Sequence, residues 1–166
     1  MYEDHRLGDY DMNDVVLKGE RLNETQVRWT LMASGAYDEL YIYNVEGTNI
    51  NSNNEVHSIF GKEPLTYINT ERGDNVPYVI NIVNVPKTYS FLDASTQPYI
   101  YNQTKGWDVK IVRYGRDPRA IMIPYDIRWP LEKIKISNAY KQFNSWGTGS
   151  IEDNEWYKYP EIELVY

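Results

Sequence analysis

Residues 8–16, with the sequence GDYDMNDVV, decide our expectation for the fold and for the site. Asp9, Asp11, Asn13 and Asp14 place three carboxylates and one amide within six residues, and an apolar run begins directly afterwards. Such a run is typical of a β-strand. Hard cations such as calcium take six to eight oxygen ligands, and a tight turn can supply several of them. The stretch therefore predicts a turn that binds a structural calcium ion at the start of a strand.

The same residues partly match an EF-hand loop, and we reject that interpretation. Asp9, Asp11 and Asn13 stand at the first, third and fifth positions, and Glu20 stands at the twelfth. The sixth position requires Gly but holds Asp14. If a strand follows, Glu20 lies roughly 20 Å beyond Asp14 and cannot reach the same ion. The remaining calcium ligands must come from elsewhere in the chain.

Several sources of further ligands are open: Glu3 or Asp4, backbone carbonyls, water, or a loop distant in sequence. The alternative interpretation is a solvated acidic turn, in which Asp and Asn side chains accept hydrogen bonds from local backbone amides. Three close carboxylates repel one another unless a cation or several donors lie among them, which favours the ion. Zinc is disfavoured because His5 is the only imidazole nearby.

The rest of the pattern predicts a mainly β protein: an antiparallel β-sandwich, jelly-roll-like, with one short C-terminal helix. The helix has Ser137 as its N-cap and ends at Gly147 and Gly149. We find no internal repeat and no linker, so residues 1–166 are expected to form a single domain. The predicted strands are residues 14–18, 25–32, 39–45, 76–85, 98–101 and 107–114, and residues 161–166 alternate in the same way.

Bulk composition excludes several classes of function. The formal net charge is −7, which argues against nucleic acid or anionic lipid as a partner. The chain has no Cys, which rules out disulfides, thiolate metal sites and Cys nucleophiles. No apolar run approaches the roughly 18 residues that span a membrane. We find no signal peptide at the polar start, so we expect a piece of a longer parent protein whose targeting signal lies elsewhere.

Several stretches together resemble the LruC-type domain, a domain of unknown function. Glu3-Asp4 and the 8–16 stretch resemble its E-D and G-D-Y-D-[FM]-N-D-[LV]-V-V. Residues 55–61 (EVHSIFG) and 67–70 (YINT) resemble its E-V-H-x-x-F-G and F-[IV]-N-T. The chain departs from the family at residues 5–7, which replace an aromatic-proline lead, and in lacking a longer loop before Trp129. The chain also resembles the family's closing motif at Trp129, Pro130, Glu132, Ile136, Ala139, Tyr140, Phe143 and Trp146. The family's terminal aromatic pair is matched by Trp156 and Tyr157.

This resemblance implies a C-terminal module of exported or surface proteins of Gram-negative bacteria, with no known catalytic activity. We therefore expect a non-enzymatic, extracytoplasmic protein, secreted or at the cell surface, that acts in adhesion or ligand recognition. A glycan or a surface protein is the expected partner. The resemblance also strengthens the calcium hypothesis for Asp9, Asp11, Asn13 and Asp14.

Two alternative functions stay open. The first is a carbohydrate-binding module that stacks sugar rings on exposed aromatic side chains, for which Trp107, Trp129, Trp156 and Tyr157 are the candidate ligand-binding residues. The second is an unrecognised glycoside hydrolase, whose paired carboxylates would come from an acidic segment at residues 152–155. His57 is expected to be structural, because no G-x-S-x-G nucleophile motif accompanies it.

Overall fold

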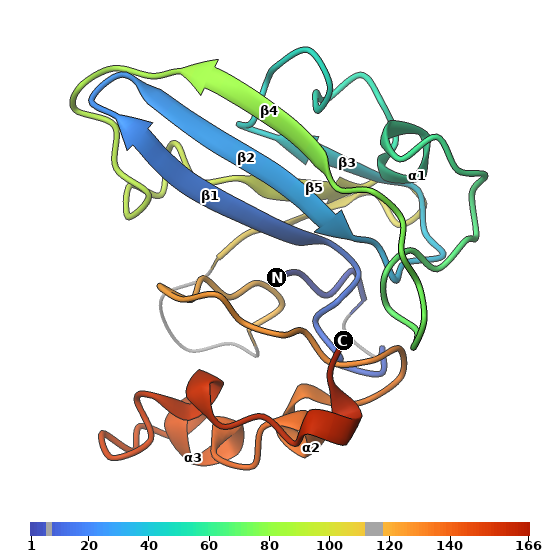
Figure 1. Cartoon of the computed structure of the whole chain (residues 1–166), viewed down its shortest axis with the longest axis vertical. Coiled ribbons are helices and arrows are strands. Elements are labelled where there is room, and N and C mark those ends of the chain that lie inside the picture. The colour runs from blue at the N-terminus through green and yellow to red at the C-terminus, as the bar shows by residue number, and fades with distance from the viewer. Residues whose placement is uncertain (6–7, 112–117) are drawn as a thin grey trace.

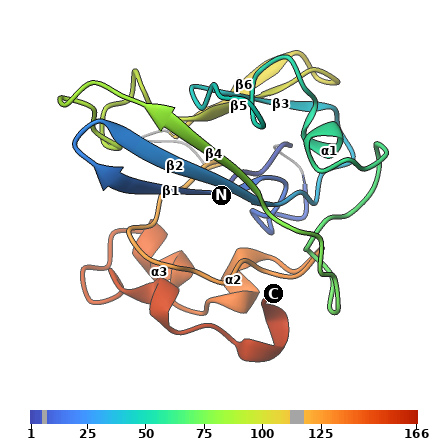
Figure 2. The ribbon, with the colours of Figure 1, turned by 45° about the horizontal axis from the view of Figure 1, so that its top comes forward.

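A computed structural model describes residues 1–5, 8–111 and 118–166, and its strands form two antiparallel sheets. The first sheet has the order β1-β2-β4, and the second has the order β3-β5-β6 (Figures 1 and 2). In the described residues each sheet has three strands, where a full jelly roll has four. The strands are β1 (Val16–Asn23), β2 (Gln26–Ala33), β3 (Leu40–Tyr43), β4 (Val79–Asn84), β5 (Tyr99–Asn102) and β6 (Trp107–Val109). The prediction of a mainly β protein is confirmed.

The core between the sheets follows from the alternation of apolar residues. Val27, Trp29 and Leu31 of β2 are buried, and they pack in one cluster with Leu40 and Ile42 of β3. Successive side chains of a strand point to opposite faces, so this one run of β2 supplies a complete inner face. The predicted common face of Val27, Trp29 and Leu31 is therefore confirmed, and the cluster supports a sandwich.

A second hydrophobic cluster joins the ends of β1 and β2 to the C-terminal part of the chain. Val16 and Ala33 contribute from the strands, and Tyr140, Phe143 and Trp156 contribute from the short helices. The N-terminal segment lies between these helices and the sheets (Figures 1 and 2). The helices are α2 (Ile136–Ala139), α3 (Phe143–Gly147) and the 3-10 helices η1 (Trp156–Lys158) and η2 (Ile162–Leu164).

The predicted single C-terminal helix is wrong in its continuity. Tyr140 ends α2 in an extended conformation, with φ −135° and ψ 96°, and α3 begins three residues later. The Tyr140 ring is fully buried, and its hydroxyl donates to the carbonyl of Arg128 at 2.5 Å. Burial of this aromatic ring and its hydrogen bond override helical spacing at Tyr140. The predicted cap is also wrong, because Lys135 precedes α2 and no side chain caps it.

Other elements differ from the sequence expectation in detail. Helix α1 (Val56–Ile59) was not predicted, and Glu55 caps it by accepting from the amides of His57 and Ser58. Strand β6 is shorter than predicted, and residues 112–114 of that prediction lie outside the described residues. The alternating tail forms η2 and one bridge to Pro130 rather than a strand. None of the helices in the described part of the chain has the length and apolar character of a bilayer span.

Candidate metal centre

The predicted acidic turn contacts the N-terminal segment, which adds two carboxylates to it. The Tyr2 amide donates to the carbonyl of Val15 at 3.0 Å, and the Asp4 amide donates to Asp14 Oδ2 at 2.6 Å. These bonds hold the side chain of Glu3 against the turn, where its Oε2 accepts from the Met12 amide at 3.3 Å. We call the five carboxylates the acidic cluster: Glu3, Asp4, Asp9, Asp11 and Asp14.

The carboxylate oxygens of the acidic cluster converge in two overlapping groups. Glu3, Asp4 and Asp14 each offer an oxygen that lies within 4.8 Å of the others, and so do Glu3, Asp9 and Asp11. Glu3 belongs to both groups. Four of the five residues are buried, and Asp9 is partly exposed. The oxygens within either group are close enough to share one coordination sphere, since calcium binds its ligands at 2.3–2.6 Å.

The backbone of the turn is folded to allow this convergence. Tyr10 and Met12 both adopt the left-handed region, with φ 62° and 64°, although neither is glycine. Such a conformation has a cost of roughly 1–3 kcal/mol per residue and persists only where the surroundings impose it. Here the Met12 side chain is fully buried in the second hydrophobic cluster, and the Tyr10 carbonyl accepts from the Ile136 amide at 2.9 Å.

Burial and mutual repulsion make these carboxylates weak acids. Burial, followed by repulsion from Asp11, raises the pKa of Glu3 to about 8. Burial and Asp9 raise the pKa of Asp11 to about 7, and burial and Asp38 raise that of Asp4 to about 6. The pKa of the fully buried Asp14 is also raised well above its usual value. A cation at this position would favour the ionised forms of all these groups.

Within residues 1–5, 8–111 and 118–166, the lysine and arginine ion pairs involve other carboxylates, such as Glu20 with Arg28 at 3.6 Å and Asp38 with Lys105 at 3.7 Å. His5 offsets part of the rise in the pKa of Asp4. Backbone amides give partial compensation: Asp11 accepts from Asn13 and Lys133 at 3.1 and 2.8 Å. Glu20 lies on β1 opposite Arg28, which agrees with our rejection of the EF-hand interpretation.

One further carboxylate reaches this region from a distant part of the sequence, and sequence reasoning missed its role. Glu132 lies shortly after Trp129 and Pro130, and the backbone amide of its neighbour Lys133 donates a hydrogen bond to Asp11. Burial, followed by repulsion from Asp11 and Asp9, raises the pKa of Glu132 to about 8. The expectation of a ligand from a distant loop was general, and no periodicity in the sequence marks Glu132.

The candidate aromatic ligand-binding residues do not form one surface. Trp129 is 3% exposed and Trp156 is 2% exposed, so the prediction that their rings lie at the surface is wrong. Trp129 stacks on Tyr166 and donates its indole N–H to the carbonyl of Asn69 at 2.7 Å. Both rings belong to the second hydrophobic cluster, where their burial removes apolar area from water.

The two remaining aromatic candidates, Trp107 and Tyr157, have different neighbours in the structure. Trp107 is partly buried on β6 and donates its indole N–H to the Asp4 carbonyl at 3.1 Å. It therefore supports the acidic cluster. Tyr157 is partly buried beside the exposed Tyr125, with ring centroids 5.8 Å apart. These positions offer no shared platform for a sugar ring.

The residues weighed for catalysis have structural partners. His57 is buried, with Nδ1 2.7 Å from Glu55 Oε1 and Nε2 3.1 Å from the Ala36 carbonyl. Both ring nitrogens thus face oxygen acceptors, as expected for a structural histidine. In the acidic segment at residues 152–155, Asp153 accepts from the Ser145 hydroxyl and Glu155 pairs with Lys158.

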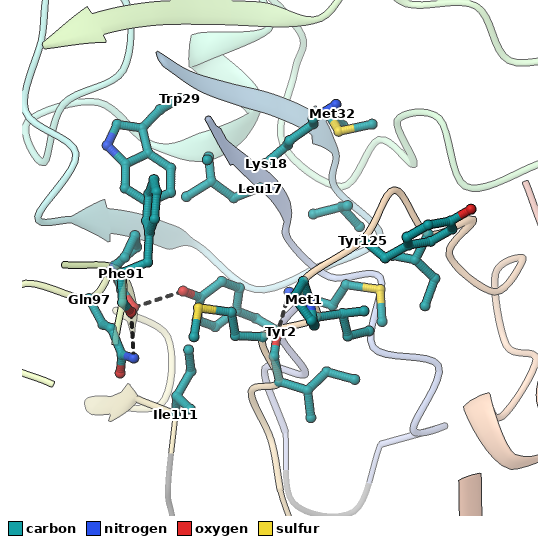
Figure 3. A pocket seen from close by; sticks show the side chains of 18 of the residues that line it. Met1, Tyr2, Leu17, Lys18, Trp29, Met32, Phe91, Gln97, Ile111 and Tyr125 are labelled. Atoms are coloured by element: carbon teal, nitrogen blue, oxygen red, sulfur yellow. Dashed lines mark hydrogen bonds between the residues drawn. The ribbon is translucent and has the colours of Figure 1, made fainter. Parts of the chain in front are cut away.

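A separate pocket of about 920 Å³ lies along β1 and the segment at residues 121–127. Tyr2, Leu17, Trp29, Phe91 and Ile111 give it a mostly apolar lining (Figure 3). The polar groups at its wall are already paired: the Tyr2 hydroxyl with the Pro98 carbonyl, the Gln97 amide with the Phe91 carbonyl, and Lys18 with Asp126. Few groups are left to orient a polar ligand, so the acidic cluster is the stronger candidate site.

Residues 114–157 match a known family. Its description is "Domain of unknown function (DUF4842)". The matched stretch includes Glu132 and helices α2 and α3, and it covers well under half of the chain. We call residues 129–166, which contribute to the second hydrophobic cluster, the C-terminal layer. The chain is thus similar to a domain of unknown function over much of this layer. A search of curated proteins finds no match. A search of solved structures finds none either.

Proposed function

We propose that this chain is a non-enzymatic module whose N-terminal turn binds a structural calcium ion. Asp9, Asp11, Asn13 and Asp14 are the proposed ligands from the turn, with Glu3 from the N-terminal segment. One observation supports the ion above all: four buried carboxylates and one partly exposed carboxylate converge, while the ion pairs of the described residues use other acids. The ion would fasten the N-terminal segment to the sheets.

The chemistry of the donor set fits calcium. All the converging groups are hard oxygen donors, and calcium accepts six to eight of them in a flexible geometry. Zinc prefers nitrogen and sulfur ligands, and the chain contains no Cys. Several negative charges close together, without counter-charge, destabilise a fold in proportion to their burial. A bound divalent cation reverses the sign of that contribution, so its binding free energy becomes folding free energy.

We further propose that the chain is an LruC-type domain and acts outside the cytoplasm. The motifs at residues 8–16, 55–61 and 67–70 support this assignment, as does the match of residues 114–157 to a domain of unknown function. Extracellular modules bind calcium with dissociation constants of about 10⁻⁴ to 10⁻³ M, which a surface environment can saturate. The larger role proposed is adhesion or recognition of a glycan or surface protein.

Thermal melts with calcium and with chelator test the ion. Calcium at about 100 times its dissociation constant stabilises a folded protein by about 2.7 kcal/mol. For a chain of this size, each kcal/mol raises Tm by about 2–4 °C. We therefore expect Tm to rise by about 5–10 °C between chelator and saturating calcium. Coincident melting curves for the wild-type protein would overturn the proposal.

A matched pair of variants assigns the effect to the acidic cluster. Asp14→Asn removes a ligand charge but keeps an oxygen that accepts from the Asp4 amide. Its calcium-induced shift in Tm should shrink to less than about half of the wild-type shift, since charge count sets calcium affinity. Asp126→Asn is the control, because Asp126 is exposed and pairs with Lys18 away from the cluster. The control should keep the full shift.

A further inference from the structure

Two oxygens that are removed from solvent lie beside Gly35, and neither has a hydrogen-bond donor among the described residues. Asn13 is fully buried, and its Oδ1 has no hydrogen-bond donor among the described residues. The same holds for Oε2 of Glu132, an atom that is also removed from solvent. A buried oxygen that accepts no hydrogen bond typically costs about 1–3 kcal/mol. Two such oxygens in one place therefore indicate that a positively charged or proton-donating partner belongs there.

The orientation of the Asn13 amide is fixed by its other end. Asn13 Nδ2 donates to the carbonyl of Pro130 at 3.1 Å, and only the NH₂ group of an amide can make this bond. Exchanging the two ends would place an oxygen against the Pro130 carbonyl. The side-chain oxygen of Asn13 must therefore point away from the Pro130 carbonyl, and it lies beside Gly35.

Gly35 marks the place where the two oxygens meet. A Cβ built on Gly35 would lie 2.0 Å from Asn13 Oδ1 and 2.7 Å from Glu132 Oε2. Gly35 is not one of the glycines with positive φ, so its backbone conformation accepts an L-residue. The space beside Gly35, and not its backbone conformation, is what a larger residue would disturb. The Gly35 amide also donates to the Asn13 carbonyl at 3.0 Å, which holds the two segments together.

We propose that Asn13 Oδ1 and Glu132 Oε2 are ligands of the same bound cation as the acidic cluster, so that the ion links the N-terminal turn to the C-terminal layer. This inference rests on the proposed function and adds a ligand from outside the N-terminal region. Two hydrogen bonds already place the segments side by side: the Lys133 amide donates to Asp11, and the Ile136 amide donates to the Tyr10 carbonyl.

The linkage has a consequence for the C-terminal layer. Lys133 adopts φ 63°, a left-handed conformation that is costly for a residue with a side chain. Its amide reaches Asp11 in this conformation, so the Asp11 carboxylate stabilises the bend after Glu132. When an ion holds Asp11 and Glu132 together, it also holds the bend from which α2 begins. Ion binding should therefore protect this bend from hydrogen exchange.

Calcium titration by calorimetry tests the inference with two variants. Gly35→Ala should displace both oxygens, and Glu132→Gln should remove one ligand charge without changing the size of the side chain. We expect each variant to bind calcium roughly tenfold or more weakly, because ligand number and charge set affinity. The matched controls are Gly147→Ala, where nothing lies within 4 Å of the new methyl group, and Glu63→Gln at an exposed position. Both controls should bind like the wild type.

The outcomes separate this inference from the proposed function. If the wild type binds no calcium, both fail. If the wild type binds calcium and both variants bind equally well, only the link to Glu132 is overturned. Hydrogen exchange gives a second readout that does not require Gly35→Ala to fold: calcium should slow amide exchange at residues 131–136 in the wild type. Glu132→Gln should lose this protection, and unchanged protection in that variant would contradict the link.

Discussion

The core between the sheets and most of the acidic cluster are buried, but burial has opposite effects on their free energies. Leu31 and Ile42 are fully buried, and each removes apolar area from water at about 25 cal/mol per Å². Glu3 and Asp11 are each 1% exposed, and burial disfavours their charged forms. Burial alone therefore does not indicate stability. The chemistry of the buried group decides whether burial stabilises the folded state or destabilises it.

The largest expected effect comes from a truncation in the apolar core between the sheets. Leu31→Ala should lower the free energy of unfolding by about 2–5 kcal/mol, through lost transfer free energy and the cavity that remains. Because Leu31 lies in the first cluster and not in the acidic cluster, the loss should be equal in calcium and in chelator. Urea denaturation under both conditions measures this. A loss that depends strongly on calcium would mean that the two regions are coupled.

The β-sheets were predictable because their signal is local. Alternation in β2 places Val27, Trp29 and Leu31 on one face, and a short turn pairs β1 with β2. The pairing of β2 with β4 joins segments far apart in the sequence, and no local pattern indicates it. The break after α2 was not predictable in this way. Helical spacing continues through Tyr140, and only the hydrogen bond from its hydroxyl to Arg128, together with burial of its ring, shows why the helix stops.

The candidate site also has a part that local sequence predicts and a part that it does not. Asp9, Asp11 and Asp14 are neighbours in sequence, so their spacing alone indicated a cation turn. Glu3 was named only as one of several possible sources of ligands. Glu132 follows the turn by more than a hundred residues, and it reaches Asn13 only because two hydrophobic clusters fold the chain back. Long-range juxtaposition of this kind leaves no pattern in a single sequence.

The next effect in size is a pH dependence that only the metal-free protein should show. The folded-state pKa values of Glu3, Asp11 and Asp4 are raised to about 8, 7 and 6, above the values of an unfolded chain. The folded state then holds more protons than the unfolded state. Stability in chelator should therefore fall as pH rises from about 4 to about 8, because the unfolded chain releases over this range the protons that the folded state retains.

Calcium should remove this slope, because metal binding requires the deprotonated carboxylates and releases their protons. Melting temperatures between pH 5.5 and 8, with and without calcium, give the comparison directly. Equal slopes under both conditions would show that the ion does not contact these groups. A rise of stability with pH in chelator would contradict the raised pKa values themselves.

A smaller effect is a change in the free energy of unfolding whose sign depends on calcium. Glu3→Gln removes the ionisable group shared by both groups of carboxylates. In chelator near pH 7 it should stabilise the protein by roughly 1–2 kcal/mol, because folding no longer requires this buried group to take up a proton or to carry a charge. In saturating calcium it should destabilise the protein, because a ligand is lost. Chemical denaturation of both proteins under both conditions tests this, and a variant that is destabilised equally in each would assign Glu3 a packing role only.

The smallest expected effect comes from a carboxylate outside the acidic cluster, whose two oxygens both have hydrogen-bond partners. Glu55 accepts from the amides of His57 and Ser58 at 2.8 and 3.2 Å, and its Oε1 lies 2.7 Å from His57 Nδ1. Burial raises its pKa, but these hydrogen bonds outweigh burial, and the net pKa is lowered. Glu55→Ala should cost about 1 kcal/mol through loss of the α1 cap.

This loss should be the same in calcium and in chelator, since α1 packs against β3 and takes no part in the acidic cluster. Its pH dependence should also have the opposite sign to that of the cluster. A lowered folded-state pKa adds stability above the pKa of the unfolded chain and loses it as pH falls through the folded value. Thermal melts of Glu55→Ala and wild type from pH 3 to 7 measure the difference. If their Tm difference instead widened on acidification, hydrogen-bond donors alone would not explain why the pKa of the partly buried Glu55 is lowered while the pKa values of Glu3 and Asp11 are raised.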